Sequence, residues 1–186
     1  MFEFDPKRLA KLESLREAGI EPYPNGLAVK HTLAQAVAAG GEATQEELAE
    51  RSDEFVVAGR LMFKNEMGKA GFARLLDSTG RMQIYVKKNE VGEDAFAEWK
   101  RLDLGDWVYV SGTLMRTRRG ELSIKAKTVR LASKCIESLP DKHKGFTDGE
   151  SRQRMRYLDL AINEETRKTF AARSLIVRRI REFFDA

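Results

Sequence analysis

The chain has 186 residues, of which 42% are apolar and 33% charged, and its formal net charge at pH 7 is +4. This composition is typical of a soluble globular protein with one medium domain or a small domain with appendages. No apolar run approaches the roughly 20 residues of a membrane-spanning helix, the N-terminus lacks the basic and apolar regions of a secretory signal, and one cysteine, Cys135, excludes an internal disulfide framework. We therefore expect a cytoplasmic protein with no membrane partner.

The first part of the chain has a helical pattern and an acidic balance. Residues 1–54 carry 6 basic and 11 acidic side chains. Asp5 is a suitable N-cap for a first helix that ends at Gly19. Two short helices are expected to follow, one near residues 32–39 and one that begins with a Thr-x-x-Glu capping box at Thr44. We predict that this region is an N-terminal helical segment.

From residue 55 the apolar periodicity changes to the two-residue alternation of β-strands. Residues 55–131 carry 15 basic and 9 acidic side chains, and Phe96 and Trp99 mark a short helix. The expected strands are residues 55–64, 70–77, 81–87, 107–117 and 121–131. Five strands with one helix between the third and the fourth is the element order of an OB-fold barrel. The sequence therefore predicts a mainly β fold, a five-stranded OB-fold barrel with flanking helices.

The last part of the chain returns to a helical pattern. Residues 132–150 are expected to form a linker, with a polar connector at residues 141–149. Residues 151–186 carry 9 basic and 5 acidic side chains, with a basic helix expected at residues 150–159 and a longer, amphipathic helix from Asn163. Its apolar stripe is unfinished where the chain stops, which is typical of a fragment whose missing part would cover it.

Strand alternation predicts one polar face on the barrel. Met82, Ile84 and Val86 are expected to point into the core, so their neighbours in the third strand point outward. The same alternation in the second, third and fifth strands predicts an outward set of Phe72, Arg74, Arg81, Gln83, Tyr85, Lys87, Glu121, Ser123, Lys125 and Lys127. Rings that stack bases, amides and carboxylates that read base edges, and cations that contact phosphates are what unpaired nucleotides require. The face is therefore a candidate site for single-stranded RNA.

Each of these residues also has an interpretation without RNA. Phe72 could cover one end of the barrel, and Gln83 alone would be an ordinary exposed strand residue. Glu121 could form an ion pair with Arg118 and Arg119, worth only about 0–1 kcal/mol. Arg152, Arg154 and Arg156 are typical of a solvated or interdomain face. The combination on one predicted face favours nucleic-acid binding.

The sequence contains no signal for catalysis. The two histidines, His31 and His143, lie in different regions, and neither has the spacing of a metal ligand. No G-x-x-x-x-G-K-[ST] phosphate loop or G-x-S-x-G nucleophile elbow occurs. We predict no catalytic residue, no metal site and no cofactor in this segment.

Short segments spread over nearly the whole chain carry a family resemblance. They are the opening helix with its exit at residues 19–25, residues 67–70, Phe72, Asp77, and residues 80–86, 102–106, 120–123, 139–142, 145–148 and 156–160. In this order they resemble the N-terminal part of bacterial lysyl-tRNA synthetases, with an anticodon-binding barrel followed by the start of a class II catalytic domain.

The resemblance implies roles for individual residues. Phe72 would stack on the central uridine of the tRNA-Lys anticodon, and Gln83 and Glu121 would hydrogen-bond its bases. Cations expected to support RNA binding are Lys64, Lys69, Arg74, Arg81, Arg118 and Arg119. The family makes lysyl-adenylate from ATP with magnesium and then charges tRNA-Lys. The helix at residues 163–186 resembles the first half of class II motif 1, which forms dimers. Because motifs 2 and 3 are missing, we expect this segment alone to bind tRNA without aminoacylating it.

One departure from the family and several alternatives remain. Family members usually carry two adjacent arginines before the Met-Gly-Lys bend, where this chain has Lys64, Asn65 and Glu66, so phosphate contact there is expected to weaken. The segment could instead be the same portion of an aspartyl- or asparaginyl-tRNA synthetase, or a stand-alone OB-fold protein that binds RNA or single-stranded DNA. An OB-fold protein-interaction module would bind no RNA in a salt-dependent way.

Overall fold

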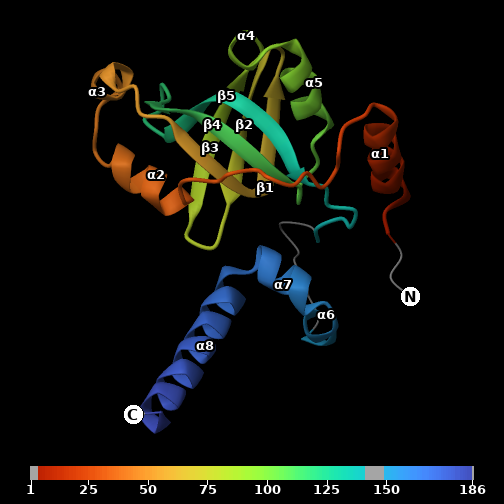
Figure 1. Cartoon of the computed structure of the whole chain (residues 1–186), viewed down its shortest axis with the longest axis vertical. Helices are drawn as coiled ribbons and strands as arrows, with labels where there is room; N and C mark the ends of the chain where they lie inside the picture. Colours follow the sequence, from red (N-terminus) through yellow and green to blue (C-terminus); the bar gives the residue numbers. More distant parts are fainter. Residues whose placement is uncertain (1–3, 141–148, 186) are drawn as a thin grey trace. The chain divides into compact units, whose positions relative to one another are not determined.

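The computed structural model describes residues 4–140 and 149–185, and the chain divides into two compact units, Met1–Ser138 and Leu139–Ala186 (Figure 1). The strands are β1 (Phe55–Met67), β2 (Ala70–Leu76), β3 (Arg81–Lys87), β4 (Trp107–Arg116) and β5 (Leu122–Ser133). The helices of the first unit are α1 (Pro6–Glu17), α2 (Leu33–Gly40), α3 (Gln45–Glu50), α4 (Lys88–Val91) and α5 (Glu93–Arg101). The second unit contains α6 (Gly149–Arg154), α7 (Arg156–Ile162) and α8 (Glu164–Phe184). The predicted connector, apart from Gly149, and the 145–148 segment of the resemblance lie outside the described residues, as does His143.

The five strands close into a barrel in the order β1-β2-β3-β5-β4. β3 and β5 are parallel, and every other neighbouring pair is antiparallel. A parallel pair needs a long connection, which here runs through α4, α5 and β4. This topology confirms the predicted fold class, a five-stranded OB-fold barrel with flanking helices.

The strand boundaries differ most at the β1–β2 hairpin. β1 was expected to end at residue 64 but continues to Met67, so the turn consists of Gly68 and Lys69. Gly68 has a φ of +61°, a conformation that glycine adopts without steric cost. The short helix α4 was not predicted, because four residues are too few to establish a helical periodicity.

The interior of the barrel follows the predicted alternation. Met82, Ile84 and Val86 are buried, and every second residue of β2 is buried opposite them. Helix α5 packs against β5 and inserts Phe96 and Trp99 into the core. The outward side chains of β2 and β3 therefore stand on a rigid, filled barrel.

A largely buried network of charged residues links the end of β5 to the segment before β4. The side chain of Lys134 is 1% exposed, and its Nζ lies 2.7 Å from Asp103 Oδ2 and 2.8 Å from Asp106 Oδ2. Asp106 Oδ1 also accepts the N–H of Cys135 at 2.8 Å, and Lys11 of α1 pairs with Asp103. Burial raises the pKa of Asp103, but the ammonium groups of Lys11 and Lys134 outweigh it and leave that pKa below its usual value.

The second unit is organised around another buried carboxylate. The predicted single helix at residues 150–159 is wrong: α6 and α7 are separated by Met155, whose φ of −109° and ψ of 50° are not helical. The break lets Arg152 and Arg156 both reach Asp159, whose side chain is 1% exposed, at 3.3 and 3.2 Å. The hydroxyl of Thr166 in α8 donates to the same carboxylate at 3.0 Å. One aspartate thus ties α6, α7 and α8 together.

Helix α8 carries a run of large apolar side chains that are exposed within its unit. They are Leu175, Ile176, Val177, Ile180, Phe183 and Phe184, with exposures from 40% to 78%. Arginine and glutamate residues lie between them, and across the described ranges no helix combines the length and the apolar character that crossing a bilayer requires.

Candidate nucleic-acid interface

Register sets the order of the side chains on the outside of the barrel. We call the outward side chains of β1, β2, β3 and the start of β5 the outer face, which comprises Phe63, Asn65, Phe72, Arg74, Gln83, Tyr85, Ser123 and Lys125. Asn65, Phe72, Tyr85 and Lys125 form one row across the four strands, the Phe72 row. Phe63, Arg74, Gln83 and Ser123 form the next, the Arg74 row. Arg81, at the start of β3, and Glu121, the residue before β5, lie beyond the Arg74 row.

The Phe72 row contains an aromatic pair. The ring centroids of Phe72 and Tyr85 lie 4.9 Å apart with an interplanar angle of 35°, and both residues are partly exposed. At the end of the row, Lys125 Nζ lies 2.9 Å from the carboxylate of Glu90 in α4, and this lysine lowers the pKa of Glu90. Phe72 therefore packs against Tyr85 on the outer face and does not close a barrel end.

The Arg74 row contains the amide and an exposed ion pair. Gln83 Nε2 donates to Ser123 Oγ at 2.9 Å, whereas Gln83 Oε1 makes no hydrogen bond within the described residues. Ser123, expected to be outside, is fully buried on this side of β5. Glu121 pairs with Arg74 at 3.4 Å, with the two side chains 48% and 42% exposed, rather than with Arg118 or Arg119. The row thus offers a fixed amide and an ion pair that water reaches.

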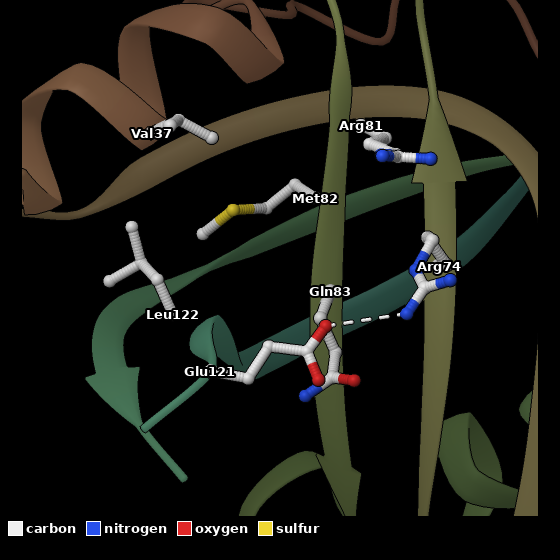
Figure 2. Close-up of a pocket in the computed structure, with 7 residues that line it drawn as sticks. All are labelled: Val37, Arg74, Arg81, Met82, Gln83, Glu121 and Leu122. Carbon is white, nitrogen blue, oxygen red and sulfur yellow. Dashed lines mark hydrogen bonds and ion pairs between the residues drawn. The ribbon is translucent and has the colours of Figure 1, made fainter. Parts of the chain in front are cut away.

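A pocket of about 370 Å³ adjoins the Arg74 row (Figure 2). Gln83 and Glu121 lie on one side of it, and Figure 2 shows Val37, Met82 and Leu122 pointing toward one another on the other. The full lining is Val37, Arg74, Arg81, Met82, Gln83, Glu121 and Leu122. The combination of an apolar wall and a polar edge suits the face and the edge of a nucleobase.

Helix α2 supplies part of that wall because the β2–β3 turn holds its N-terminus. Asp77 Oδ2 accepts the N–H of Leu33 at 2.8 Å, and Thr79 Oγ1 accepts the N–H of Ala34 at 3.1 Å. Burial raises the pKa of Asp77, but hydrogen bonds from Leu33, Thr79 and Gly80 outweigh it and lower that pKa. At the other end of α2, Gly40 lies against Leu122 so closely that a Cβ would clash with it.

Most of the predicted cations surround the outer face. Arg81 lies beside the pocket, and Lys69 is exposed at the tip of the β1–β2 hairpin. Arg118 and Arg119 are exposed in the β4–β5 hairpin and form no ion pair with any described residue. Positive groups therefore lie at both ends of the face.

Lys64 does not belong to this group. Its side chain is 11% exposed and lies over the ring of Trp99, 5.1 Å from the centroid. Its Nζ donates to the carbonyls of Lys100 and Leu102 at 3.0 Å and pairs with Glu66 at 2.7 Å. These hydrogen bonds satisfy carbonyl groups at the C-terminal end of α5. Lys64 is therefore largely covered at a position where the sequence predicted a phosphate contact.

Two residues of the outer face were not identified as site residues from the sequence. Phe63 lies opposite Arg74 on the neighbouring strand and is 40% exposed, and Asn65 lies opposite Phe72. A β-bulge between Leu61 and Phe63 shifts the register of β1, and such a bulge reverses the side on which the following residues point. Alternation counted along the sequence would have put Phe63 inside.

Side chains that could bind a metal ion do not cluster in residues 4–140 and 149–185. No cluster of three or more His, Cys, Asp or Glu side chains there could hold a metal ion. His31 Nδ1 accepts the N–H of Val56 at 3.1 Å, and its ring lies 5.1 Å from that of Phe55. Among the described residues, His31 therefore contacts the start of β1.

Comparison with protein families matches residues 55–132 to a model described as an OB-fold nucleic acid binding domain, the tRNA anticodon type. The match and the closed five-stranded barrel together assign the OB fold to these residues. The matched range spans β1 to β5, so it includes the whole outer face.

The whole chain also has close relatives among curated proteins. It is 48% identical over 177 residues to the lysine–tRNA ligase of Dechloromonas aromatica, covering 95% of this chain and 35% of the relative. The lysine–tRNA ligases of Lactococcus lactis and Bacillus subtilis are 47% and 42% identical to it, respectively, over 178 residues. Each alignment covers 96% of this chain and 36% of the relative. The chain is a homologue of the lysine–tRNA ligases, which confirms the resemblance, and it spans about a third of the length of these relatives.

Proposed function

We propose that the OB-fold domain binds the anticodon stem-loop of tRNA-Lys on its outer face. The observation that carries the proposal is that Phe72 of β2, Gln83 of β3 and Glu121, the residue before β5, gather on one side of a barrel that matches a nucleic acid binding family. The lysine–tRNA ligase relatives supply the choice of RNA, because such an enzyme must distinguish its own tRNA from the others.

In this proposal each side chain meets a different part of the RNA. The Phe72 ring, supported by Tyr85, stacks on one unpaired base. Gln83, whose amide is held by Ser123, presents its carbonyl oxygen to the base edge, while Glu121 accepts hydrogen bonds from base N–H groups. Arg81, Lys69, Arg118 and Arg119 contact phosphates on either side.

The relatives also support a proposal for the parent activity. We infer that the full enzyme joins lysine to tRNA-Lys using ATP and Mg²⁺, in the cytoplasm where translation takes place. The segment described here is proposed to bind tRNA without aminoacylating it. Incubation with lysine, ATP, Mg²⁺ and tRNA is expected to yield no lysyl-tRNA, and detectable charging would refute this part of the proposal.

A homodimer through α8 is a further part of the proposal. The exposed apolar residues of this helix, such as Ile176 and Phe183, support packing against a second subunit. Sedimentation over a range of concentrations measures the association, which Ile176→Asp is expected to weaken by putting a charge on the apolar stripe. A wild-type chain that stays monomeric at every concentration would speak against dimerisation by this segment.

RNA binding is tested with the anticodon stem-loops of tRNA-Lys, tRNA-Asp and tRNA-Asn. Fluorescence anisotropy is expected to give the tightest binding for tRNA-Lys, with affinity falling steeply as salt rises because phosphates release counterions. Preference for the aspartate or asparagine loop would instead support the sister-enzyme alternative, and salt-independent or absent binding would exclude an RNA interface.

Phe72→Ala tests the stacking role. It is expected to weaken binding by about 1–3 kcal/mol while leaving the melting temperature nearly unchanged, because Phe72 is not in the barrel interior. Phe72→Trp, which keeps a ring, is the matched control and retains most of the affinity. Equal affinities for the wild type and Phe72→Ala would remove Phe72 from the site.

A further inference from the structure

The polar side chains of β3 continue past Gln83, through Tyr85 to Lys87 at the end of the strand. We propose that Tyr85 and Lys87 form a ribose–phosphate subsite for the nucleotide whose base stacks on Phe72. The Tyr85 hydroxyl hydrogen-bonds the ribose 2′-OH, and the Lys87 ammonium group contacts the adjoining phosphate. The proposal rests on the proposed RNA-binding function and adds a means by which the barrel distinguishes RNA from DNA.

The first support is the order of the side chains along β2 and β3. Phe72 lies directly opposite Tyr85. One outward step along the two strands, Arg74 lies opposite Gln83. A base that stacks on Phe72 and turns its hydrogen-bonding edge toward Gln83 carries its sugar on the side that faces away from the Arg74 row. In that direction the outward residues of β3 are Tyr85 and then Lys87, so these two side chains meet the sugar and its phosphate.

The second support is the state of the Tyr85 side chain. Its ring packs against Phe72, with 4.9 Å between the ring centroids, so the ring has a fixed neighbour on the outer face. Its hydroxyl makes no hydrogen bond with any described residue. Among the described residues, the only buried side-chain nitrogen or oxygen without a partner is Nε1 of Trp99, so water reaches the Tyr85 hydroxyl. A phenol can both donate and accept, as can the 2′-OH that DNA lacks.

The third support is the charge at this end of the face. Lys87 is exposed and forms no ion pair with any described residue. The carboxylate of Glu90 faces it, but Lys125 holds that carboxylate at 2.9 Å; the hydrogen bond from Lys125 is the main cause of the lowered pKa of Glu90, and Lys87 adds a smaller contribution. Lys69, also exposed, adjoins the end of β3, because its carbonyl accepts the N–H of the residue after Lys87 at 2.9 Å. Two exposed cations are thus available to a phosphate.

The hydroxyl is tested with anticodon stem-loops of tRNA-Lys in which one loop nucleotide at a time carries a 2′-deoxyribose. On the all-ribose loop, Tyr85→Phe, which keeps the ring beside Phe72, is expected to weaken binding about 2- to 12-fold, the range for one neutral hydrogen bond. At a single 2′-deoxy position the wild type is expected to lose the same factor and Tyr85→Phe to lose nothing more. That position is expected to be the nucleotide whose base, when removed, also abolishes the effect of Phe72→Ala.

The phosphate contact is tested by the salt dependence of binding. Lys87→Gln is expected to make the slope of log K against log salt shallower by about 0.7, the value for one phosphate contact on a single strand. Lys87→Arg keeps the charge and is expected to keep the slope. Lys7→Gln, which removes an exposed cation from α1, is the matched control and is expected to leave the slope unchanged. A wild-type slope in Lys87→Gln would refute the phosphate contact.

A second control and two contrary outcomes separate the subsite from RNA binding itself. Tyr23→Phe removes a hydroxyl in the segment between α1 and α2, beside the C-terminal end of β5, and is expected to leave affinity unchanged. If Phe72→Ala weakens binding but Tyr85→Phe does not, or if the Tyr85→Phe loss persists on every 2′-deoxy loop, the ribose contact is refuted while RNA binding stands. If neither variant alters binding, the proposed function itself fails.

Discussion

Two charged clusters of the barrel differ in how much water reaches them. In the Lys134 network (Lys134, Asp103 and Asp106), Lys134 and Asp106 are at most 1% exposed, Asp103 is 19% exposed, and each carboxylate has at least two partners. The Arg74–Glu121 pair is nearly half exposed, with a single contact of 3.4 Å. A buried charge that loses its partner is costly, whereas an exposed pair contributes about 0–1 kcal/mol. We infer that the first cluster serves the fold and that the second is available to a ligand.

The largest effect is expected when the Lys134 network is broken. Lys134→Met keeps the length of the side chain but leaves Asp103 and Asp106 without their shared ammonium group, so unfolding free energy is expected to fall by about 3–5 kcal/mol. Urea denaturation of the chain measures the loss. Lys11→Met is the matched control, because Lys11 is 47% exposed, and it is expected to cost about 0–1 kcal/mol. Similar losses for both variants would contradict the distinction between buried and exposed pairs.

The same network is expected to make stability fall in acid. The pKa of Asp103 is below its usual value of 3.8 in the folded chain, so an unfolded chain takes up the proton first as the pH falls. The stabilisation is therefore complete above about pH 4 and is lost as the pH falls through the folded pKa. Urea midpoints at pH 7 and pH 3 measure the loss, which Asp103→Asn is expected to reduce. Asp53→Asn, at an exposed position, is the control, and an unchanged pH dependence in Asp103→Asn would exclude this role.

Features that depend only on neighbouring residues, such as helix caps and strand alternation, could be predicted from the sequence. The N-cap at Asp5 and the capping box at Thr44 are present: Asp5 Oδ1 accepts the N–H of Lys7 at 2.9 Å, and Thr44 Oγ1 accepts the N–H of Glu47 at 3.2 Å. Alternation in β2 and β3 also put Phe72 and Gln83 on the same side, because no bulge interrupts either strand.

Features that depend on distant residues or on an irregularity within a strand could not be predicted from the sequence. The bulge in β1 turns Phe63 outward and Lys64 inward, and nothing in the residue types around Met62 marks it. Asp106 and Lys134 are 28 positions apart in the sequence, so their burial together could not be read from either segment. Long-range pairing and changes of strand phase are therefore what the structure adds.

A moderate effect on base preference is expected when the side-chain amide of Gln83, which Ser123 holds in place, is removed. Gln83→Ala loses hydrogen bonds to one base, worth about 0.5–1.5 kcal/mol, and is expected to narrow the difference between the cognate loop and loops with a changed base. Binding to four loops that vary at that base measures the preference. Ser123→Ala, which releases the amide without removing it, is expected to have a smaller effect in the same direction. Equal losses on all four loops would indicate a non-specific contact.

The smallest effect is expected at the Arg74–Glu121 pair, and it separates the two clusters most clearly. Arg74→Gln is expected to change unfolding free energy by no more than about 1 kcal/mol, since water already solvates both groups. In RNA binding, however, one phosphate contact would be lost, so the slope of log K against log salt is expected to become shallower by about 0.7. Arg74→Lys keeps the charge and is expected to keep the slope. A variant with the wild-type slope but lower stability would mean that Arg74 belongs with Lys134, as part of the fold rather than of the binding surface.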